Sequence, residues 1–392
     1  MPTLFEDGDG YLKTHVHVEE IENELKKKFG EDFQLKEKDL TEKANPDGNT
    51  SLLATFERDG KKLLVKLPTC VKLRPMFTNE NQGSLENLTK MVHNREIDFY
   101  EELLPKAPNM NVPQFVCGKK FDGDSGSGFS VMEMVKGRNL MTHEYAGFEA
   151  TKQMLDNLAA LAAISVKLSP EELKEHSNVP QTILDIQQIY FNKKSFGVSI
   201  DRLIAYIPEE KELFEEIRHF AIEKDLVNAE QLLSVNKRLG LPPVFVHADF
   251  WRGNVLFNET NQESFELSTI LDWQCQKMGN PGEDLAKLYT FAVDKSHDFK
   301  SSDWEDLLKY YYSRLEHHLG EEKAPYTYDE LLSSFNECLP PCALLVISYH
   351  PFNAESDKRK GLPESEWEAA KQMIVSNAVY IIRQVRDLLK AK

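Results

Sequence analysis

The sequence has few basic side chains, no long apolar run and no paired cysteines. Its 392 residues include 47 Lys and Arg against 64 Asp and Glu, which gives a formal net charge of −17 at pH 7. Because nucleic-acid backbones are bound by clustered Lys and Arg, this composition argues against a nucleic-acid partner. The longest apolar stretches, 158–166 and 343–347, are far shorter than the roughly 20 residues that cross a bilayer, so no membrane span is expected.

Cysteine usage and the first residues bear on the cellular compartment. The five cysteines are scattered and include no C-x-x-C pair, a pattern more typical of reduced thiols than of disulfides or a zinc site. The first ten residues carry three acidic side chains and no basic stretch followed by an apolar one, so no secretory signal is predicted. We therefore expect a cytoplasmic protein.

Periodicity and turn signals divide the chain into an N-terminal part with strands and a mainly helical C-terminal part. In the first part, helices are predicted at 15–29 and 84–104, and strands at 52–56, 63–67 and 129–134. Arg58-Asp59-Gly60 is predicted to be a tight turn that joins the first two strands. In the second part, helices are predicted at 148–168, 183–190, 200–207, 211–223, 302–319 and 364–389, and short strands at 243–247, 254–257 and 267–271. The predicted fold class is α+β with two lobes, 1–135 and 136–392: a small antiparallel-sheet lobe with a helix, and a large mainly helical lobe.

The short strands of the second part carry an ordered set of chemically active residues. His247, Asp249 and Asn254 form an H-x-D-x-x-x-x-N pattern, and Asp272 follows at the end of a later strand. This spacing is that of the catalytic loop and metal-binding aspartate of phosphotransferases with the protein-kinase fold. Phosphoryl transfer to a hydroxyl needs a carboxylate that accepts the proton, predicted to be Asp249. It also needs oxygen ligands for Mg²⁺, predicted to be Asn254 and Asp272.

Each of these residues also has a plain structural interpretation. Asn254 would suit a turn, and Asp272 would suit a strand-end cap. His247 is expected to support the catalytic loop.

Two residues near the motif also have plain structural interpretations. Trp273, beside Asp272, fits core packing better than an aromatic box for a cationic substrate. Asp284, at the start of a later helix, fits an N-cap better than a direct catalytic part.

A lysine and a glutamate in the first part are predicted to anchor the nucleotide. Lys66 lies in a predicted strand, and Glu96 lies on the apolar stripe of a predicted helix, four residues after Val92 and three before Phe99. A buried carboxylate needs a cation, whereas a lone strand lysine is usually solvated. Each residue therefore supplies the partner that the other requires, and we expect the pair to bind ATP phosphates.

The nucleotide loop and the hinge have weaker signatures. The segment 45–51 contains Gly48 but no G-x-G-x-x-G, so it is either a simple hairpin turn or a loop that contacts ATP through backbone amides and the Ser51 hydroxyl. The segment 131–135 precedes a break at Gly137 and is expected to be the hinge. There, the backbone of Glu133 and Val135 would meet adenine.

In this order, the motifs resemble those of the ecdysteroid-kinase-like, or CHK-kinase-like, group within the choline kinase and aminoglycoside phosphotransferase superfamily. The resemblance implies a protein-kinase-like fold with ATP- and Mg²⁺-dependent phosphorylation of a small-molecule hydroxyl, on a sterol-like, amino-alcohol or related acceptor. By that analogy Asp249 is the base and Lys66 with Glu96 is the nucleotide-anchoring pair. The family usually has H-G-D where this chain has His247-Ala248-Asp249, and the alanine adds a methyl group where the backbone is tight.

Two other functions stay open from the sequence. The glycine-poor loop and Ala248 would also suit a nucleotide-binding pseudokinase or interaction module without turnover. His247 and Asp249 would suit a metallohydrolase, although no second histidine cluster completes such a site. A protein kinase is disfavoured because no A-P-E segment follows Asp272. The motifs specify neither the acceptor nor the oligomeric state.

Overall fold

The computed structural model describes residues 3–44, 50–75, 79–123, 126–177, 192–260, 264–292, 301–359 and 361–391. The chain forms two compact units. The first comprises Met1–Pro108, Val112–Lys136 and Ile270–Gln276, and the second comprises Asn109–Asn111, Gly137–Thr269 and Lys277–Lys392. The segment that carries Asp272 therefore belongs with the N-terminal sheet, although it comes late in the sequence.

A five-stranded antiparallel sheet organises the first unit, with the order β1-β2-β3-β5-β4. Its strands are β1 (Thr41–Lys43), β2 (Ser51–Arg58), β3 (Lys61–Pro68), β4 (Phe115–Lys119) and β5 (Phe129–Glu133). Asp59 and Gly60 join β2 to β3, and both have positive φ, 50° and 76°. A two-residue Asp-Gly turn of this kind follows the twist of its strands, as the sequence predicted.

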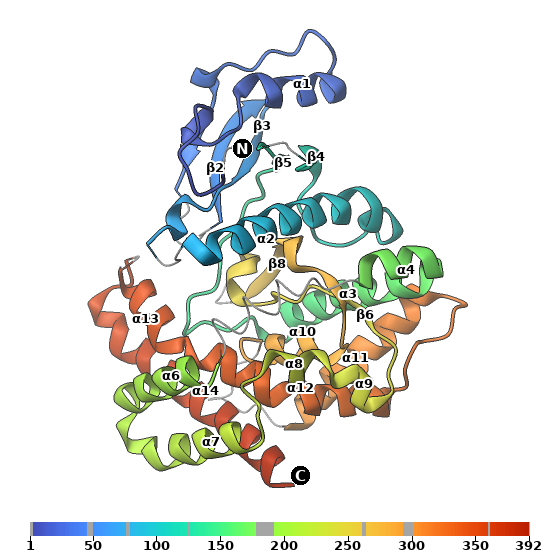
Figure 1. Ribbon diagram of the computed structural model, residues 1–392. Helices are drawn as coiled ribbons and strands as arrows, with labels where there is room; N and C mark the ends of the chain where they lie inside the picture. The colour runs from blue at the N-terminus through green and yellow to red at the C-terminus, as the bar shows by residue number, and fades with distance from the viewer. Residues whose placement is uncertain are drawn as a thin grey trace. The chain divides into compact units, whose positions relative to one another are not determined.

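The two faces of this sheet have different neighbours (Figure 1). On one face, Ala54, Phe56 and Val65 pack with Ile21 and Leu25 of helix α1 (Val18–Phe29) in one apolar core. Successive side chains of a strand alternate between faces, so β3 residues next to the core positions point the other way. That second face meets helix α2 (Asn79–Asp98), which continues as a π-helical segment (Phe99–Leu103) and a 3-10 turn (Leu104–Lys106).

The second unit is mainly helical. Its helices are α3 (Gly147–Lys167), α4 (Pro170–Ser177), α6 (Lys193–Tyr206), α7 (Lys211–Glu223), α8 (Ala229–Leu233), α9 (Val235–Leu239), α10 (Gly282–Tyr289), α11 (Ser301–Leu319), α12 (Tyr328–Ser348), α13 (His350–Arg359) and α14 (Glu364–Ala391). Two strand pairs interrupt them: β6 (Val244–Val246) with β9 (Lys277–Gly279), and β7 (Val255–Glu259) with β8 (Phe265–Ile270). The predicted α+β class is confirmed. The predicted helix at 183–190 lies outside the described residues.

Helix α10 is buried along its whole length. All eight of its residues are buried, and it packs against α12. Three of them, Glu283, Asp284 and Lys287, have acidic or basic side chains. Charged groups tolerate such burial only when partners replace the lost water, so the contacts of this helix indicate what it holds in place.

In the described part of the chain, α12 is the helix whose length and apolar composition would allow it to cross a membrane. Its apolar window runs over Tyr328–Ile347, and 61% of that window is buried inside the protein. Pro340 and Pro341 lie within the helix. Burial of this kind is also found in the core helix of a folded domain.

Candidate active site

In the first unit, Lys66 is held between two carboxylates. Its Nζ lies 2.7 Å from Glu96 Oε2 and 2.7 Å from Asp272 Oδ1. Glu96 is 2% exposed, as its place on the apolar stripe predicted. The structure therefore brings together Lys66 and Glu96, as expected, and adds Asp272 as a second partner that the spacing did not indicate.

Burial and charge act in opposite directions on these groups. Burial by itself would lower the pKa of Lys66, but the charges of Asp272 and Glu96 outweigh it and raise that pKa above its usual value. Burial raises the pKa of Glu96, against the attraction of Lys66, and the charge of Asp272 raises it further. A second cation beside Asp272 would relieve this repulsion between carboxylates.

A tightly packed turn sets the position of Asp272. Asp272 has φ of 62°, and the 3-10 turn Trp273–Cys275 follows it. The fully buried Trp273 ring stacks on Phe99 at a centroid distance of 4.1 Å, and its Nε1 donates to the Ile270 carbonyl at 3.0 Å. Gln274 Nε2 donates to Asp272 Oδ2 at 3.0 Å. Trp273 is thus a core residue, as expected, and it fixes the turn on the segment that continues α2.

The other residues predicted to contact the nucleotide lie on or beside the same sheet. Ser51 begins β2 and points to the same face of the sheet as Leu53. Because Leu53 is paired with Lys66 in β3, Ser51 and Lys66 lie on one face of the sheet. The Glu133 N–H donates to the Gln114 carbonyl at 2.8 Å, and its carboxylate lies 2.9 Å from Lys61 Nζ. Because Glu133 is engaged in this way, Val135, just beyond β5, is the better hinge candidate of the two. Residues 45–49 of the predicted phosphate loop lie outside the described residues.

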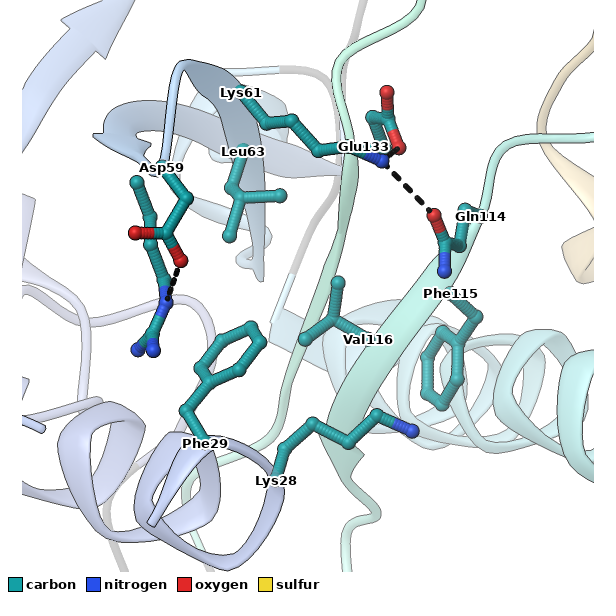
Figure 2. A pocket seen from close by; sticks show the side chains of 10 residues that line it. Lys28, Phe29, Asp59, Lys61, Leu63, Gln114, Phe115, Val116 and Glu133 are labelled. Carbon is teal, nitrogen blue, oxygen red and sulfur yellow. Dashed lines mark hydrogen bonds and ion pairs between the residues drawn. The ribbon is translucent and has the colours of Figure 1, made fainter. Parts of the chain in front are cut away.

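A hollow of about 140 Å³ opens on the first unit (Figure 2). Leu63, Phe115 and Val116 contribute to its apolar lining. Lys61 and Glu133, which form an ion pair, line it as well. Leu63 and Lys66 are three positions apart in β3, so they point to opposite faces of the sheet. The hollow is therefore separate from the cluster around Lys66.

In the second unit, the H-x-D-x-x-x-x-N segment runs from the end of β6 through the 3-10 turn Arg252–Asn254 to β7. Asn254 Nδ2 donates to the Asp249 main-chain carbonyl and to Asp249 Oδ2, both at 2.9 Å. His247 is fully buried, and its Nδ1 accepts the Asp249 N–H at 3.3 Å. Two side chains of the motif therefore hold the predicted base, while Asn254 Oδ1 is the oxygen suited to a cation.

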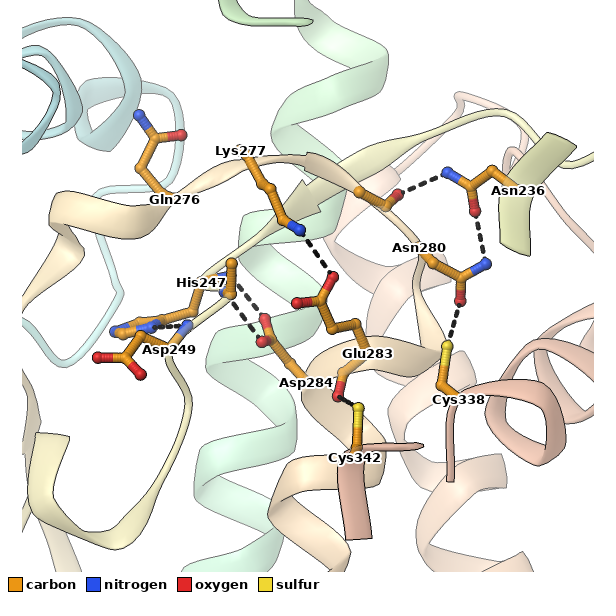
Figure 3. A network of polar contacts seen from close by, with 12 residues as sticks. Asn236, His247, Asp249, Gln276, Lys277, Asn280, Glu283, Asp284, Cys338 and Cys342 are labelled. Carbon is orange, nitrogen blue, oxygen red and sulfur yellow. Dashed lines mark hydrogen bonds and ion pairs between the residues drawn. The ribbon is translucent and has the colours of Figure 1, made fainter. Parts of the chain in front are cut away.

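The expected N-cap at Asp284 is wrong. Pro281 occupies the N-cap position of α10, and Asp284 lies in the first turn of the helix. Its carboxylate turns inward and accepts the N–H of His247 at 2.6 Å and the N–H of Ala248 at 3.0 Å (Figure 3). Burial raises the pKa of Asp284 to about 6, although Lys287 and these two N–H donors oppose the rise. Asp284 thus holds the backbone of the predicted catalytic loop.

A buried ion cluster next to Asp284 was missed by the sequence analysis. Glu283 lies 3.1 Å from Lys277 Nζ (Figure 3). It also lies 3.0 Å from Lys287 Nζ. Burial by itself would raise the pKa of Glu283, but the two lysine charges outweigh it and lower the pKa to about 2. Lys287 Nζ also donates to the Ala248 carbonyl. The available signal was the i,i+4 spacing of Glu283 and Lys287 on a short helix.

Ala248 lies where these contacts converge. Its φ of 65° is in the left-handed region, which costs a residue with a Cβ about 1 kcal/mol or more. The H-G-D pattern suggested by the resemblance has glycine here, and glycine adopts this conformation freely. The sequence analysis expected a tight backbone at Ala248, and the left-handed φ of this residue is the physical reason.

The residues fit the cofactors that the sequence predicted. Asp272 and Asn254 offer a carboxylate and an amide oxygen, the hard donors that Mg²⁺ prefers. Lys66 offers a charged ammonium group of the kind that binds phosphates. Within the described ranges, no group of three or more His, Cys, Asp and Glu side chains could hold a metal ion by itself. The complete burial of His247 disfavours the metallohydrolase, whose metal ion and water would need access to this side chain.

Comparison with known proteins places the chain in a family. Residues 4–391 match DUF1679, described as "Uncharacterized oxidoreductase dhs-27". The chain belongs to the DUF1679 family. A curated relative from Caenorhabditis elegans, named Uncharacterized oxidoreductase dhs-27, is 23% identical over 269 residues. The match covers 65% of this chain and 31% of that protein, so this DUF1679 chain spans about a third of the relative's length.

Similar solved structures come from three kinds of small-molecule kinase. Spectinomycin phosphotransferase APH(9)-Ia, in complex with ADP and spectinomycin, is 14% identical with a TM-score of 0.46, over 94% of this chain and 98% of that one. Choline kinase from Cryptosporidium parvum is 14% identical with a TM-score of 0.47, over 94% and 96%. An ethanolamine kinase from Plasmodium vivax is 13% identical with a TM-score of 0.45, over 91% and 87%.

Proposed function

We propose that this DUF1679 protein is an ATP- and Mg²⁺-dependent phosphotransferase that phosphorylates a hydroxyl group of a small molecule. The observation that carries the proposal is the pair of preformed residue sets. Lys66 lies with Glu96 and Asp272 in the first unit, and Asp249 is held by Asn254 in the second. In kind and in chain order, these are the groups that phosphoryl transfer from ATP requires.

Each residue has a defined part in the proposed reaction. Lys66 would bind ATP phosphates. Asn254 and Asp272 are the residues proposed to supply oxygen ligands for Mg²⁺, which would neutralise charge on the phosphates. Asp249 orients the acceptor hydroxyl and takes its proton. The bond from the γ-phosphorus to the ADP oxygen breaks as the bond to the acceptor oxygen forms, so the products are ADP and a phosphate ester. The acceptor is proposed to be sterol-like, an amino-alcohol or a related alcohol.

Asp249→Asn tests the proposal. ATP consumption is measured against a panel of alcohols, sterols and amino-alcohols. A general base contributes a factor of roughly 10²–10⁴, so the variant is expected to lose at least about a hundredfold in kcat. Asp329→Asn makes the same chemical change at an exposed position of the same unit and is expected to leave turnover unchanged. Equal turnover in wild type and Asp249→Asn would show that the base is assigned wrongly.

A nucleotide-binding pseudokinase is the second candidate, favoured by the left-handed Ala248 and the glycine-poor loop. Both candidates predict that ATP with Mg²⁺ raises the melting temperature, because a ligand that binds the folded state stabilises it. They differ in turnover. A melting shift without ATP consumption on any acceptor in the panel would favour the pseudokinase.

An oxidoreductase function is not proposed for this chain. The word stands in the family description and in the name of the nematode relative, of which the chain covers 31%. Dinucleotide-dependent dehydrogenases bind their cofactor on parallel βαβ units with a G-x-G-x-x-G turn. The sequence contains no such pattern, and the strand pairs described for the five-stranded sheet are antiparallel.

A further inference from the structure

We propose that Lys287 is a positioning residue for phosphoryl transfer, because it holds the Ala248 carbonyl and thereby fixes the backbone that carries Asp249. The inference rests on the proposed function, in which Asp249 is the base. It concerns a residue three positions beyond Asp284 on α10 that makes a separate contact with the loop.

One side of α10 binds three backbone groups of the loop, all within His247 and Ala248. Asp284 accepts the N–H of His247 at 2.6 Å and the N–H of Ala248 at 3.0 Å. Lys287 Nζ donates to the next group, the Ala248 carbonyl. Residues three apart on a helix lie on neighbouring positions of one face, so both side chains reach the same stretch of loop. Ala248 is therefore bound on both its peptide groups.

These contacts hold Ala248 in a conformation that it does not favour alone. Its φ of 65° is disfavoured for a residue with a Cβ. A hydrogen bond from a charged donor is roughly twice as strong as one between neutral groups, so the Lys287 contact is suited to oppose this strain. Asp249 follows directly, and a change of φ or ψ at Ala248 would displace its carboxylate.

Glu283 orients Lys287, and its second partner, Lys277, provides a matched control. Burial by itself would lower the pKa of Lys287, but the charge of Glu283 outweighs it and raises the pKa, which keeps the ammonium group charged. Lys277 is also buried and pairs with the other oxygen of Glu283 at 3.1 Å. Of these two lysines, Lys287 is the one that the described contacts join to Ala248. Removing either lysine breaks one ion pair with Glu283, but only the removal of Lys287 also breaks the contact with the Ala248 carbonyl.

Steady-state kinetics compare Lys287→Met with Lys277→Met. Lys287→Met is expected to lower kcat about tenfold or more and to change KM for ATP less than about twofold, because the loss acts on the transition state. Lys277→Met is expected to keep kcat within about twofold while losing similar thermal stability. Lys287→Arg keeps a charged donor and is expected to recover most of kcat. Adding Ala248→Gly to Lys287→Met is expected to restore part of kcat, since glycine adopts the left-handed φ freely.

Hydrogen exchange of residues 244–255 tests the same contact without turnover. Exchange is expected to be faster in Lys287→Met than in wild type or Lys277→Met, and to slow again when Ala248→Gly is added. If the Met variants do not fold, Lys287→Gln and Lys277→Gln are compared in the same way. The proposal is overturned if the two lysine variants have the same kcat and the same exchange. A wild type without turnover, but with faster exchange in Lys287→Met, would overturn the proposed function and leave the backbone contact supported.

Discussion

Glu283→Gln tests how much the buried ion cluster stabilises the protein. The Glu283 carboxylate lies 3.1 Å from Lys277 Nζ and 3.0 Å from Lys287 Nζ, and the residue is 2% exposed. These charges lower its pKa from 4.5 to about 2. A shift of this size corresponds to about 3 kcal/mol of stabilisation when the carboxyl is ionised in both the folded and the unfolded state. Removing the charge also takes from two buried lysines the carboxylate that they share, so we expect a loss of about 3–5 kcal/mol at neutral pH.

The sign of the pH dependence follows from the lowered pKa. The unfolded carboxyl takes up a proton near pH 4.5, whereas the folded one does so only near pH 2. The stabilisation is therefore complete above pH 4.5 and is lost as the pH falls toward 2, with about 2 kcal/mol gone by pH 3. The glutamine variant lacks this titration. The difference in unfolding free energy between wild type and Glu283→Gln is thus expected to shrink by about 2 kcal/mol between pH 5 and pH 3.

Urea unfolding, followed by tryptophan fluorescence at pH 5, 4 and 3, measures this difference. Glu366→Gln, at an exposed position of α14, is the control, and its difference from wild type is expected to stay flat within about 0.5 kcal/mol. A difference for Glu283→Gln that is equally flat would refute the reasoning, because Glu283 would then titrate alike in the folded and unfolded states.

Two further substitutions test the local geometry. Ala248→Gly relieves the left-handed φ and is expected to raise the free energy of unfolding by up to about 1 kcal/mol, measured by urea unfolding; a loss of stability would contradict the argument from strain. Glu96→Gln leaves Lys66 with one carboxylate partner and is expected to weaken MgATP binding about tenfold, or about 1.4 kcal/mol, by calorimetry. Glu101→Gln, at an exposed position just beyond α2, is the control, and equal affinities in the two variants would contradict the anchoring role.

The sequence by itself determined the features that depend on neighbouring residues. The Asp59-Gly60 turn, the alternation along β3 and the apolar stripe that turns Glu96 inward all follow from backbone preferences and side-chain periods over a few positions. The pairing of Lys66 with Glu96 was also predictable, because a buried carboxylate requires a cation and the chain offered one on an adjacent element.

Only the tertiary structure decided the contacts between distant segments. Lys66 meets Asp272, 206 residues away, and the Asp284 carboxylate binds the His247 N–H, 37 residues earlier in the chain. From the sequence, Asp284 looked like a helix cap, because its position near a helix start was visible and its partners were not. Helical periodicity indicates which face a side chain occupies, but the group that face meets depends on how the whole chain packs. For that reason the motif order pointed to the chemistry, while the residues that hold the loop in place were found only in the fold.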